Sequence, residues 1–120
     1  DAAIRVLMMP RDTNYHGTIF GGVILSHIDQ AGAVAAIRAG CRQVATVAMD
    51  KVEFHQPVKV GELVSFYTEV VRRGNTSITI QVCVEATQRD GGETVPVTSA
   101  QITFVNLDKN GKKTPLPAAD

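Results

Sequence analysis

The chain has 120 residues, of which 44% are hydrophobic and 20% are charged. That length suits a single domain over residues 1–120, and the composition is too apolar for intrinsic disorder. Twelve basic residues balance twelve acidic residues, which argues against nucleic acid and anionic membranes as partners, because both attract a positively charged surface.

The two cysteines, Cys41 and Cys83, lie far apart and form no Cys-x-x-Cys spacing, and no histidine cluster accompanies them. We therefore expect free thiols and no metal site. No charged segment followed by an apolar run and a cleavage site opens the sequence, so the cytoplasm is the expected location. The longest apolar stretch, at 19–37, has His27 and Asp29 at its middle, which favours a buried helix over a membrane span.

The predicted elements begin with a strand at 4–9, an apolar run that is followed by a polar loop at 11–18. Residues 21–39 are rich in valine, isoleucine, leucine and alanine, and Gly40 stands where a left-handed C-terminal cap belongs, so this segment predicts a long helix. Four further runs are typical of strands, at residues 44–54, 62–72, 76–88 and 94–106.

Residues typical of turns separate these four runs, at 56–61, 73–75 and 89–92. Connections this short predict antiparallel neighbours, and the alternation of apolar residues within the runs predicts a sheet with one buried face. One strand, one long helix and four antiparallel strands predict an α+β fold. In it a curved five-stranded sheet wraps around the helix, which is the hotdog arrangement.

The predicted helix is apolar over most of its circumference, so we expect it to be buried nearly all round. Gly32 in its interior costs about 1 kcal/mol relative to alanine, which predicts close packing against the sheet. Asp29 is the exception, because a buried carboxylate without a partner is strongly unfavourable. It indicates a general base or nucleophile in a cleft, or else a structural carboxylate that accepts hydrogen bonds from a loop or a neighbouring subunit.

The start of the helix is the second unusual feature, because Gly21 and Gly22 stand where a serine, threonine or aspartate cap would be usual. Uncovered amides at a helix N-terminus favour negative charge and can hold an oxyanion. On spacing alone, a tight glycine turn that brings the helix close to the sheet is the more common explanation.

Residues 10–22, PRDTNYHGTIFGG, followed by Ile28-Asp29-Gln30-Ala31-Gly32, resemble the cytosolic acyl-CoA hydrolase branch of the hotdog thioesterases, which includes the bacterial YciA type. Further matches lie at 46–50, 54–62, 104–105 and 108–111 and extend the likeness over almost the whole chain. The resemblance implies hydrolysis of acyl-CoA to a carboxylic acid and coenzyme A. It implies no cofactor, because coenzyme A is part of the substrate and the product.

In that family an asparagine of the loop and an aspartate of the central helix face each other across a dimer interface, and these match Asn14 and Asp29. The thioester carbonyl lies against a backbone amide at the helix start, which falls at Gly22, or at Gly21 in the other register. The resemblance thus implies that Asp29 activates water or attacks the acyl carbon. Asn14 would position the water or the thioester, and Gly22 would hold the oxyanion.

Coenzyme A carries phosphates, so the mouth of the site needs local cations. The Arg72-Arg73 pair lies where similar proteins hold the nucleotide, and Lys112 and Lys113 are further candidates, although charged turns are usually just solvated. The full set of expected substrate-binding residues is Gly17, Phe20, Gly21, Arg72, Arg73 and Gly74. Acyl chain length depends on how Tyr15, Val23 and Phe54 shape the tunnel.

A split site and a long edge strand both predict a homo-oligomer, with a dimer as the minimum and a hexamer built as a trimer of dimers as the larger form the family suggests. We expect a loop or interface role for His16 and structural roles for His27 and His55. The sequence leaves three alternatives open. The first is a hydroxyacyl-thioester dehydratase of the same fold, which would need a histidine and an acid in other positions. The second is a module that binds acyl-CoA without catalysis, and the third is a purely structural assembly protein.

Overall fold

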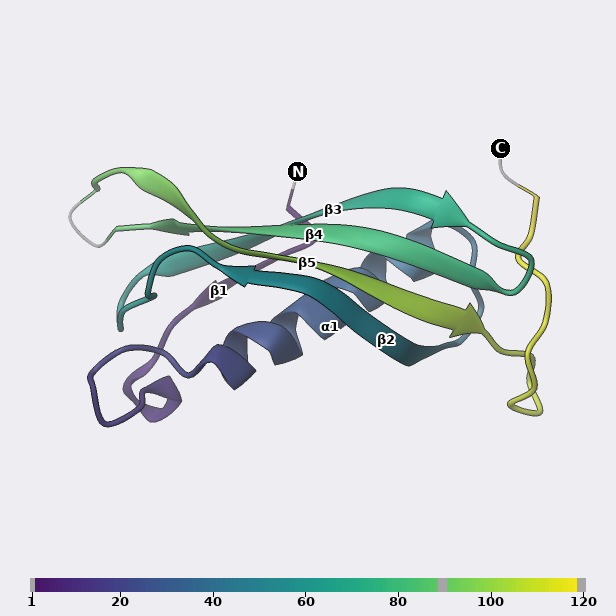
Figure 1. Ribbon diagram of the computed structural model, residues 1–120, viewed down its shortest axis with the longest axis horizontal. Helices are drawn as coiled ribbons and strands as arrows, with labels where there is room; N and C mark the ends of the chain where they lie inside the picture. The colour runs from purple at the N-terminus through teal and green to yellow at the C-terminus, as the bar shows by residue number, and fades with distance from the viewer. Residues whose placement is uncertain (1, 89–90, 119–120) are drawn as a thin grey trace.

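The computed structural model describes residues 2–88 and 91–118, and residues 89–90 of the predicted turn lie outside the described residues. One helix, α1 (Gly21–Arg38), lies along one face of a five-stranded antiparallel sheet (Figure 1). The strands are β1 (Ile4–Leu7), β2 (Val44–Phe54), β3 (Leu63–Arg73), β4 (Ser77–Thr87) and β5 (Thr94–Asn106), and a short 3-10 helix covers Pro10–Asp12. The predicted α+β hotdog fold is confirmed, with element ends within two residues of those expected.

The strand order in the sheet is β1-β3-β4-β5-β2. The prediction that short connections join neighbouring strands is correct for β3–β4 and β4–β5 but wrong for β2 and β3, which lie at different places in the sheet. The connection between β2 and β3 instead crosses the open end of the sheet. Val58 in this crossing is buried, and its carbonyl accepts a hydrogen bond from the Ile19 amide at 2.8 Å. The crossing therefore packs against the segment that leads into α1.

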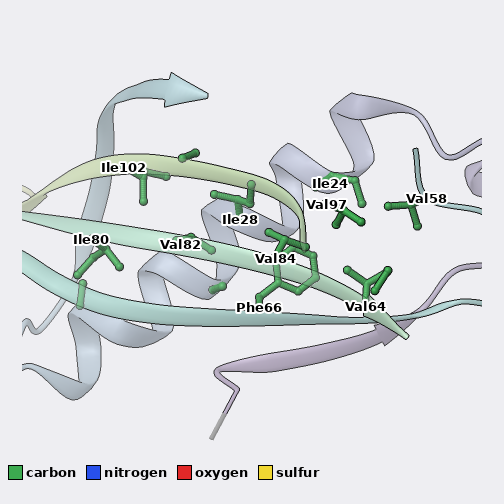
Figure 2. Close-up of a cluster of buried hydrophobic side chains, with 14 of the residues drawn as sticks. Ile24, Ile28, Val58, Val64, Phe66, Ile80, Val82, Val84, Val97 and Ile102 are labelled. Carbon is green, nitrogen blue, oxygen red and sulfur yellow. The ribbon is translucent and has the colours of Figure 1, made fainter. Parts of the chain in front are cut away.

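The core lies between α1 and the inner face of the sheet (Figure 2). The predicted alternation is confirmed in β4, whose inward-facing side chains are essentially inaccessible to solvent; they are Ile78, Ile80, Val82, Val84 and Ala86. At Gly32 a Cβ atom would come within 2.7 Å of Ile102 Cγ2 and 2.8 Å of the Phe104 ring. This contact confirms the close approach of helix and sheet that the interior glycine predicted.

The prediction that α1 is buried nearly all round is wrong for a single chain. Its fully buried residues form one face, namely Ile24, Ile28, Ala31, Gly32 and Ala36. Ile37 on another side of the helix is 54% exposed. Because the sheet covers only one side of α1, the remaining apolar surface has no cover within the chain. In the part of the chain that the structure describes, no helix has the length and apolar character needed to span a membrane.

The C-terminal end of α1 is closed by the predicted glycine cap. Gly40 has a φ of +109°, its amide donates to the carbonyl of Ile37 at 3.0 Å, and the amide of Cys41 donates to the carbonyl of Ala36 at 3.1 Å. This pair of hydrogen bonds is the Schellman arrangement. Cys41 is buried there, Cys83 is exposed on the sheet, and both thiols are free as predicted.

Candidate active site

Asp29 lies on α1 beside the edge strand β2. Its Oδ1 accepts a hydrogen bond of 2.5 Å from the hydroxyl of Thr46, an exposed residue of β2. Asp29 itself is only half-buried, so the expectation of a buried carboxylate is wrong for a single chain, since the sheet ends at β2 and leaves this side of the helix open. The contact with Thr46 fixes one carboxylate oxygen and leaves the other free of protein partners among the described residues.

Thr46 was missed by sequence reasoning as a site residue. It belongs to a stretch that carries the family resemblance, but a threonine in a strand is most simply explained by β-propensity. The one available signal was its place in the first strand after the long helix that carries Asp29. Only the folded chain shows that its hydroxyl reaches Asp29.

The Asn14 side chain is occupied by its own loop. Its Oδ1 accepts hydrogen bonds from the backbone amides of His16 at 2.9 Å and Thr18 at 3.2 Å, and its Nδ2 donates a hydrogen bond to Thr18 Oγ1 at 3.1 Å. These bonds form a local turn of the kind that asparagine favours. The loop precedes α1, whereas Asp29 lies further along the helix. With a rise of 1.5 Å per residue, Asp29 is about 12 Å from Gly21 along the helix axis. A single chain therefore does not bring Asn14 and Asp29 together.

The N-terminal end of α1 is open. Phe20 occupies the N-cap position without a side-chain hydrogen bond. Among the described residues, the amides of Gly21 and Gly22 have no acceptor in the backbone or in a side chain. A Cβ atom at Gly22 would meet nothing within 4 Å, whereas one at Gly21 would lie 3.2 Å from Phe54 Cζ. Close packing thus explains Gly21 and not Gly22, whose amide is available to a ligand.

A pocket of about 240 Å³ opens beside this helix end. Its walls come from the start of α1, the end of β2, the crossing segment and β5, and its lining residues are Ile19, Gly21, Ile24, Phe54, His55, Gln56, Pro57, Val58 and Thr98. Phe54 at the end of β2 is 55% exposed. Of the expected substrate-binding residues, the chain gathers Gly17, Phe20 and Gly21 at this end.

Arg73 and Gly74 lie at and just after the end of β3, near the C-terminal end of α1. In Figure 1, β3 ends at the right. The Arg73 guanidinium donates to the carbonyls of Ala39 at 3.4 Å and Pro117 at 2.8 Å, and the Gly74 amide donates to the carbonyl of Ser77 at 2.8 Å. An 18-residue helix is about 27 Å long, so one chain does not bring Arg73 and Gly74 beside Gly21. These hydrogen bonds give both residues a structural role, and their expected contact with the substrate stays a prediction.

Arg72 is exposed and lines a polar hollow on the outer face of the sheet together with Lys51 and Asp50. Lys112 and Lys113 are exposed in the segment after β5. None of these cations lies beside the N-terminal end of α1 in the same chain. Any contact between them and a coenzyme A bound there requires a neighbouring chain.

The histidines occupy the places expected for structural or loop residues. His27 Nδ1 donates to the Val23 carbonyl at 2.9 Å, and its ring lies 5.7 Å from that of Phe66. The His16 ring lies tilted against the exposed Tyr15 ring, with the ring centroids 3.9 Å apart, and His55 is exposed at the pocket. Among residues 2–88 and 91–118, no cluster of three or more histidine, cysteine or acidic side chains is arranged to hold a metal ion.

A curved sheet around one helix, with a carboxylate on the helix and uncovered amides at its start, defines a hotdog fold with the layout of a thioester-hydrolysing enzyme. The family model of the thioesterase superfamily matches residues 16–93, and the chain belongs to this family. The predicted class, a hotdog-fold thioesterase, is therefore confirmed.

Individual relatives cover nearly the whole chain. The acyl-CoA thioester hydrolase YciA of Salmonella typhimurium is 38% identical over 120 residues, which cover 98% of this chain and 90% of that protein. A hexameric hotdog fold thioesterase of Campylobacter jejuni is 44% identical with a TM-score of 0.91, covering 97% of this chain and 90% of that one. An acyl-CoA hydrolase of Staphylococcus aureus is 31% identical with a TM-score of 0.86, covering 96% and 70%.

Proposed function

We propose that the protein hydrolyses acyl-CoA thioesters to a carboxylic acid and coenzyme A at a site built by two chains. The observation that carries the proposal is the Asp29–Thr46 hydrogen bond of 2.5 Å on the open side of α1. The relative from Salmonella typhimurium is named an acyl-CoA thioester hydrolase. The Staphylococcus aureus enzyme has been crystallised with butyryl-CoA and coenzyme A. Both names support acyl-CoA as the substrate here.

Asp29 acts as a general base or as a nucleophile. The Thr46 hydroxyl holds one carboxylate oxygen, so the other can take a proton from water or attack the acyl carbon directly. The Gly22 amide donates to the carbonyl oxygen as it gains negative charge. The carbon–sulfur bond then breaks, and the thiolate of coenzyme A takes up a proton. Water supplies the second oxygen of the acid, either by attacking the acyl carbon itself or by hydrolysing the mixed anhydride that attack by Asp29 forms, which regenerates the carboxylate.

Two chains are needed because Asp29 and Gly22 of one chain lie about 10 Å apart along the helix axis, too far for one thioester carbonyl to contact both. In the proposed site, one chain supplies Asn14 and Gly22 and its partner supplies Asp29 and Thr46. Alanine variants of an asparagine and of a threonine are among the structures of the Staphylococcus aureus enzyme. Those two positions have the same separation along the chain as Asn14 and Thr46, which supports their place in the site.

The uncovered apolar surface supports a dimer as the smallest form and a hexamer as the complete one. Val47 and Phe54 on the free edge strand β2 are 54% and 55% exposed, and an uncovered edge strand readily pairs with a second chain. The Campylobacter jejuni relative is hexameric. The cytoplasmic location and the independence from a cofactor stay predictions.

The test is the release of free thiol from a panel of acyl-CoA esters. Asp29→Asn keeps the shape of the side chain and removes its charge, so we expect a loss in kcat of about 100-fold or more, the scale of a lost catalytic base. The matched control is Glu69→Gln, which removes an exposed carboxylate from β3. Equal rates for wild type and Asp29→Asn would contradict the role of Asp29. Binding of acyl-CoA by the wild type without thiol release would identify a binding module.

A further inference from the structure

The Asn14 side chain has one hydrogen-bonding group left for a substrate. Its Oδ1 accepts hydrogen bonds from the backbone amides of His16 at 2.9 Å and Thr18 at 3.2 Å, which use both lone pairs of an amide oxygen. Its Nδ2 carries two N–H groups. One of them donates to the Thr18 hydroxyl at 3.1 Å, and the other has no acceptor among the described residues. Asn14 therefore offers a hydrogen-bond donor and no free acceptor.

The turn at Asn14 does not by itself explain the choice of asparagine. Such a turn needs only a side-chain oxygen that accepts the backbone amide two residues further on, and aspartate forms it as well. What asparagine adds is Nδ2. The Thr18 hydroxyl lies 3.1 Å from Nδ2 and 3.3 Å from Oδ1, so it contacts both ends of the amide group. Because the backbone amides hold Oδ1 and the hydroxyl holds Nδ2, the plane of the amide is fixed.

Thr18 is itself held by the segment that connects β2 and β3. Thr18 and Lys59 form an isolated antiparallel bridge, and the amide of Ile19 donates to the Val58 carbonyl at 2.8 Å. The Lys59 amide donates in turn to Glu62 Oε1 at 2.8 Å. Val58 is 4% exposed and Glu62 is 7% exposed. Because both of these side chains are buried, the backbone that carries Thr18 is anchored in the fold.

We propose that Thr18 is a positioning residue of the shared site, which fixes Asn14 as a hydrogen-bond donor. The proposal rests on the proposed function, because Asn14 of one chain must meet Asp29 of another. The groups that come together there are a carboxylate and a thioester carbonyl oxygen that gains negative charge, and both accept hydrogen bonds. An N–H group stabilises them, whereas the amide oxygen of a rotated Asn14 would repel them. The contact with Thr18 opposes that rotation.

The test is thiol release from acyl-CoA esters by Thr18→Val, which keeps the shape of the side chain and removes its hydroxyl. We expect kcat to fall about five- to tenfold, the effect of one lost hydrogen bond, while KM changes little. Thr18→Ser restores the hydroxyl and should restore kcat. The matched control is Thr79→Val, which makes the same change at a hydroxyl that lies 3.0 Å from the Thr103 hydroxyl on the sheet. This control should leave kcat unchanged.

A second comparison places Thr18→Val in an Asn14→Ala background, with enzyme in excess over substrate so that low rates can be measured. If Thr18 acts through Asn14, the valine substitution lowers the rate no further in this background, and the two losses are not additive. An equal fold loss in both backgrounds would show that Thr18 acts by another route and would overturn the proposal.

The remaining outcomes separate this proposal from the proposed function. Normal kcat in Thr18→Val beside an active wild type would overturn the positioning role and leave the proposed hydrolysis intact. A wild type that releases no thiol from any acyl-CoA ester would contradict the hydrolysis and the positioning role together. Gel filtration shows whether each variant keeps the assembly of the wild type, and Thr18→Ala replaces Thr18→Val if the valine variant dissociates.

Discussion

The two ends of α1 differ in the hydrogen bonds that they form with the rest of the chain. At the C-terminal end, Gly40 and Cys41 donate their amides to the last turn, and Arg73 donates to the carbonyl of Ala39. At the N-terminal end, Gly21 and Gly22 have no acceptor among the described residues, and Phe20 supplies no cap. One end is closed by hydrogen bonds and the other is left open beside a pocket.

The C-terminal end of α1 therefore contributes to stability, and the N-terminal end contributes to the proposed chemistry. A serine, threonine or aspartate cap typically stabilises a helix start by about 1 kcal/mol, so an uncapped start gives up stability. A site that must hold a developing oxyanion explains that loss, because a capping side chain would occupy the same amides. The C-terminal end needs no such access, and Gly40, Cys41 and Arg73 donate hydrogen bonds to its carbonyls. We therefore expect changes at the two ends to affect different measurements.

The largest effect is expected from Gly22→Pro, which removes the proposed oxyanion donor. Loss of one such donor typically lowers kcat about 100- to 1,000-fold. The cost to folding is small, because proline is tolerated in the first turn of a helix, where the amide has no intrahelical partner. Thiol release and urea unfolding on the same samples test both halves of this statement. Gly22→Ala keeps the amide and meets nothing within 4 Å, so a loss as large as that of the proline variant would contradict the oxyanion role.

An intermediate effect is expected from alanine at the opposite end. Gly40→Ala forces a side chain into a φ of +109° and brings its Cβ within 2.7 Å of Pro117 Cγ. We expect it to lower the free energy of unfolding by about 1–3 kcal/mol while kcat changes little. Urea midpoints at a fixed protein concentration provide the measurement, with Gly22→Ala as the partner variant that meets no neighbouring atom. Equal midpoints for the two variants would show that the ends do not differ.

The smallest effect concerns the pH dependence at the closed end. Burial raises the pKa of the Cys41 thiol above its ordinary value of 9.0, and the charge of Arg73 opposes part of that rise. The folded chain then keeps the proton when the unfolded chain releases it, so stability is unaffected well below pH 9 and falls as the pH rises above it. The decrease is at most about 0.8 kcal/mol at pH 9.5. Urea unfolding should show this decrease in wild type and in the Cys83→Ala control, because the Cys83 thiol is exposed. The decrease should be absent in Cys41→Ala.

The sequence predicted those parts of the fold that depend on local rules. The left-handed cap at Gly40, the close approach at Gly32 and the alternation along β4 each follow from one residue type in one backbone setting. The crossing between β2 and β3 could not be predicted this way. Its length is that of an ordinary turn, and only the pairing of β2 with β5 reveals that it spans the sheet.

The site was predicted where a residue departs from its surroundings and missed where it does not. Asp29 stands out in an apolar helix, and the glycines stand out at a helix start. Thr46 is an ordinary strand residue, so its contact with Asp29 depends on a tertiary arrangement that no spacing reveals. Arg73 was assigned to the substrate because charge suggests phosphate, yet its guanidinium lies against the carbonyls of Ala39 and Pro117. Hydrogen bonds from a side chain to the backbone cannot be predicted from amino-acid composition.

In the proposed shared site, Asp29 comes from one chain and Asn14 comes from another. The most direct test unfolds and refolds Asp29→Asn and Asn14→Ala chains together and follows thiol release from the mixture. In a mixed dimer, one site then holds both substitutions and the other site holds neither. We expect each variant alone to be nearly inactive and the mixture to recover a substantial fraction of wild-type activity. A mixture no more active than its components would show that both residues serve the same chain, and the shared site would be wrong.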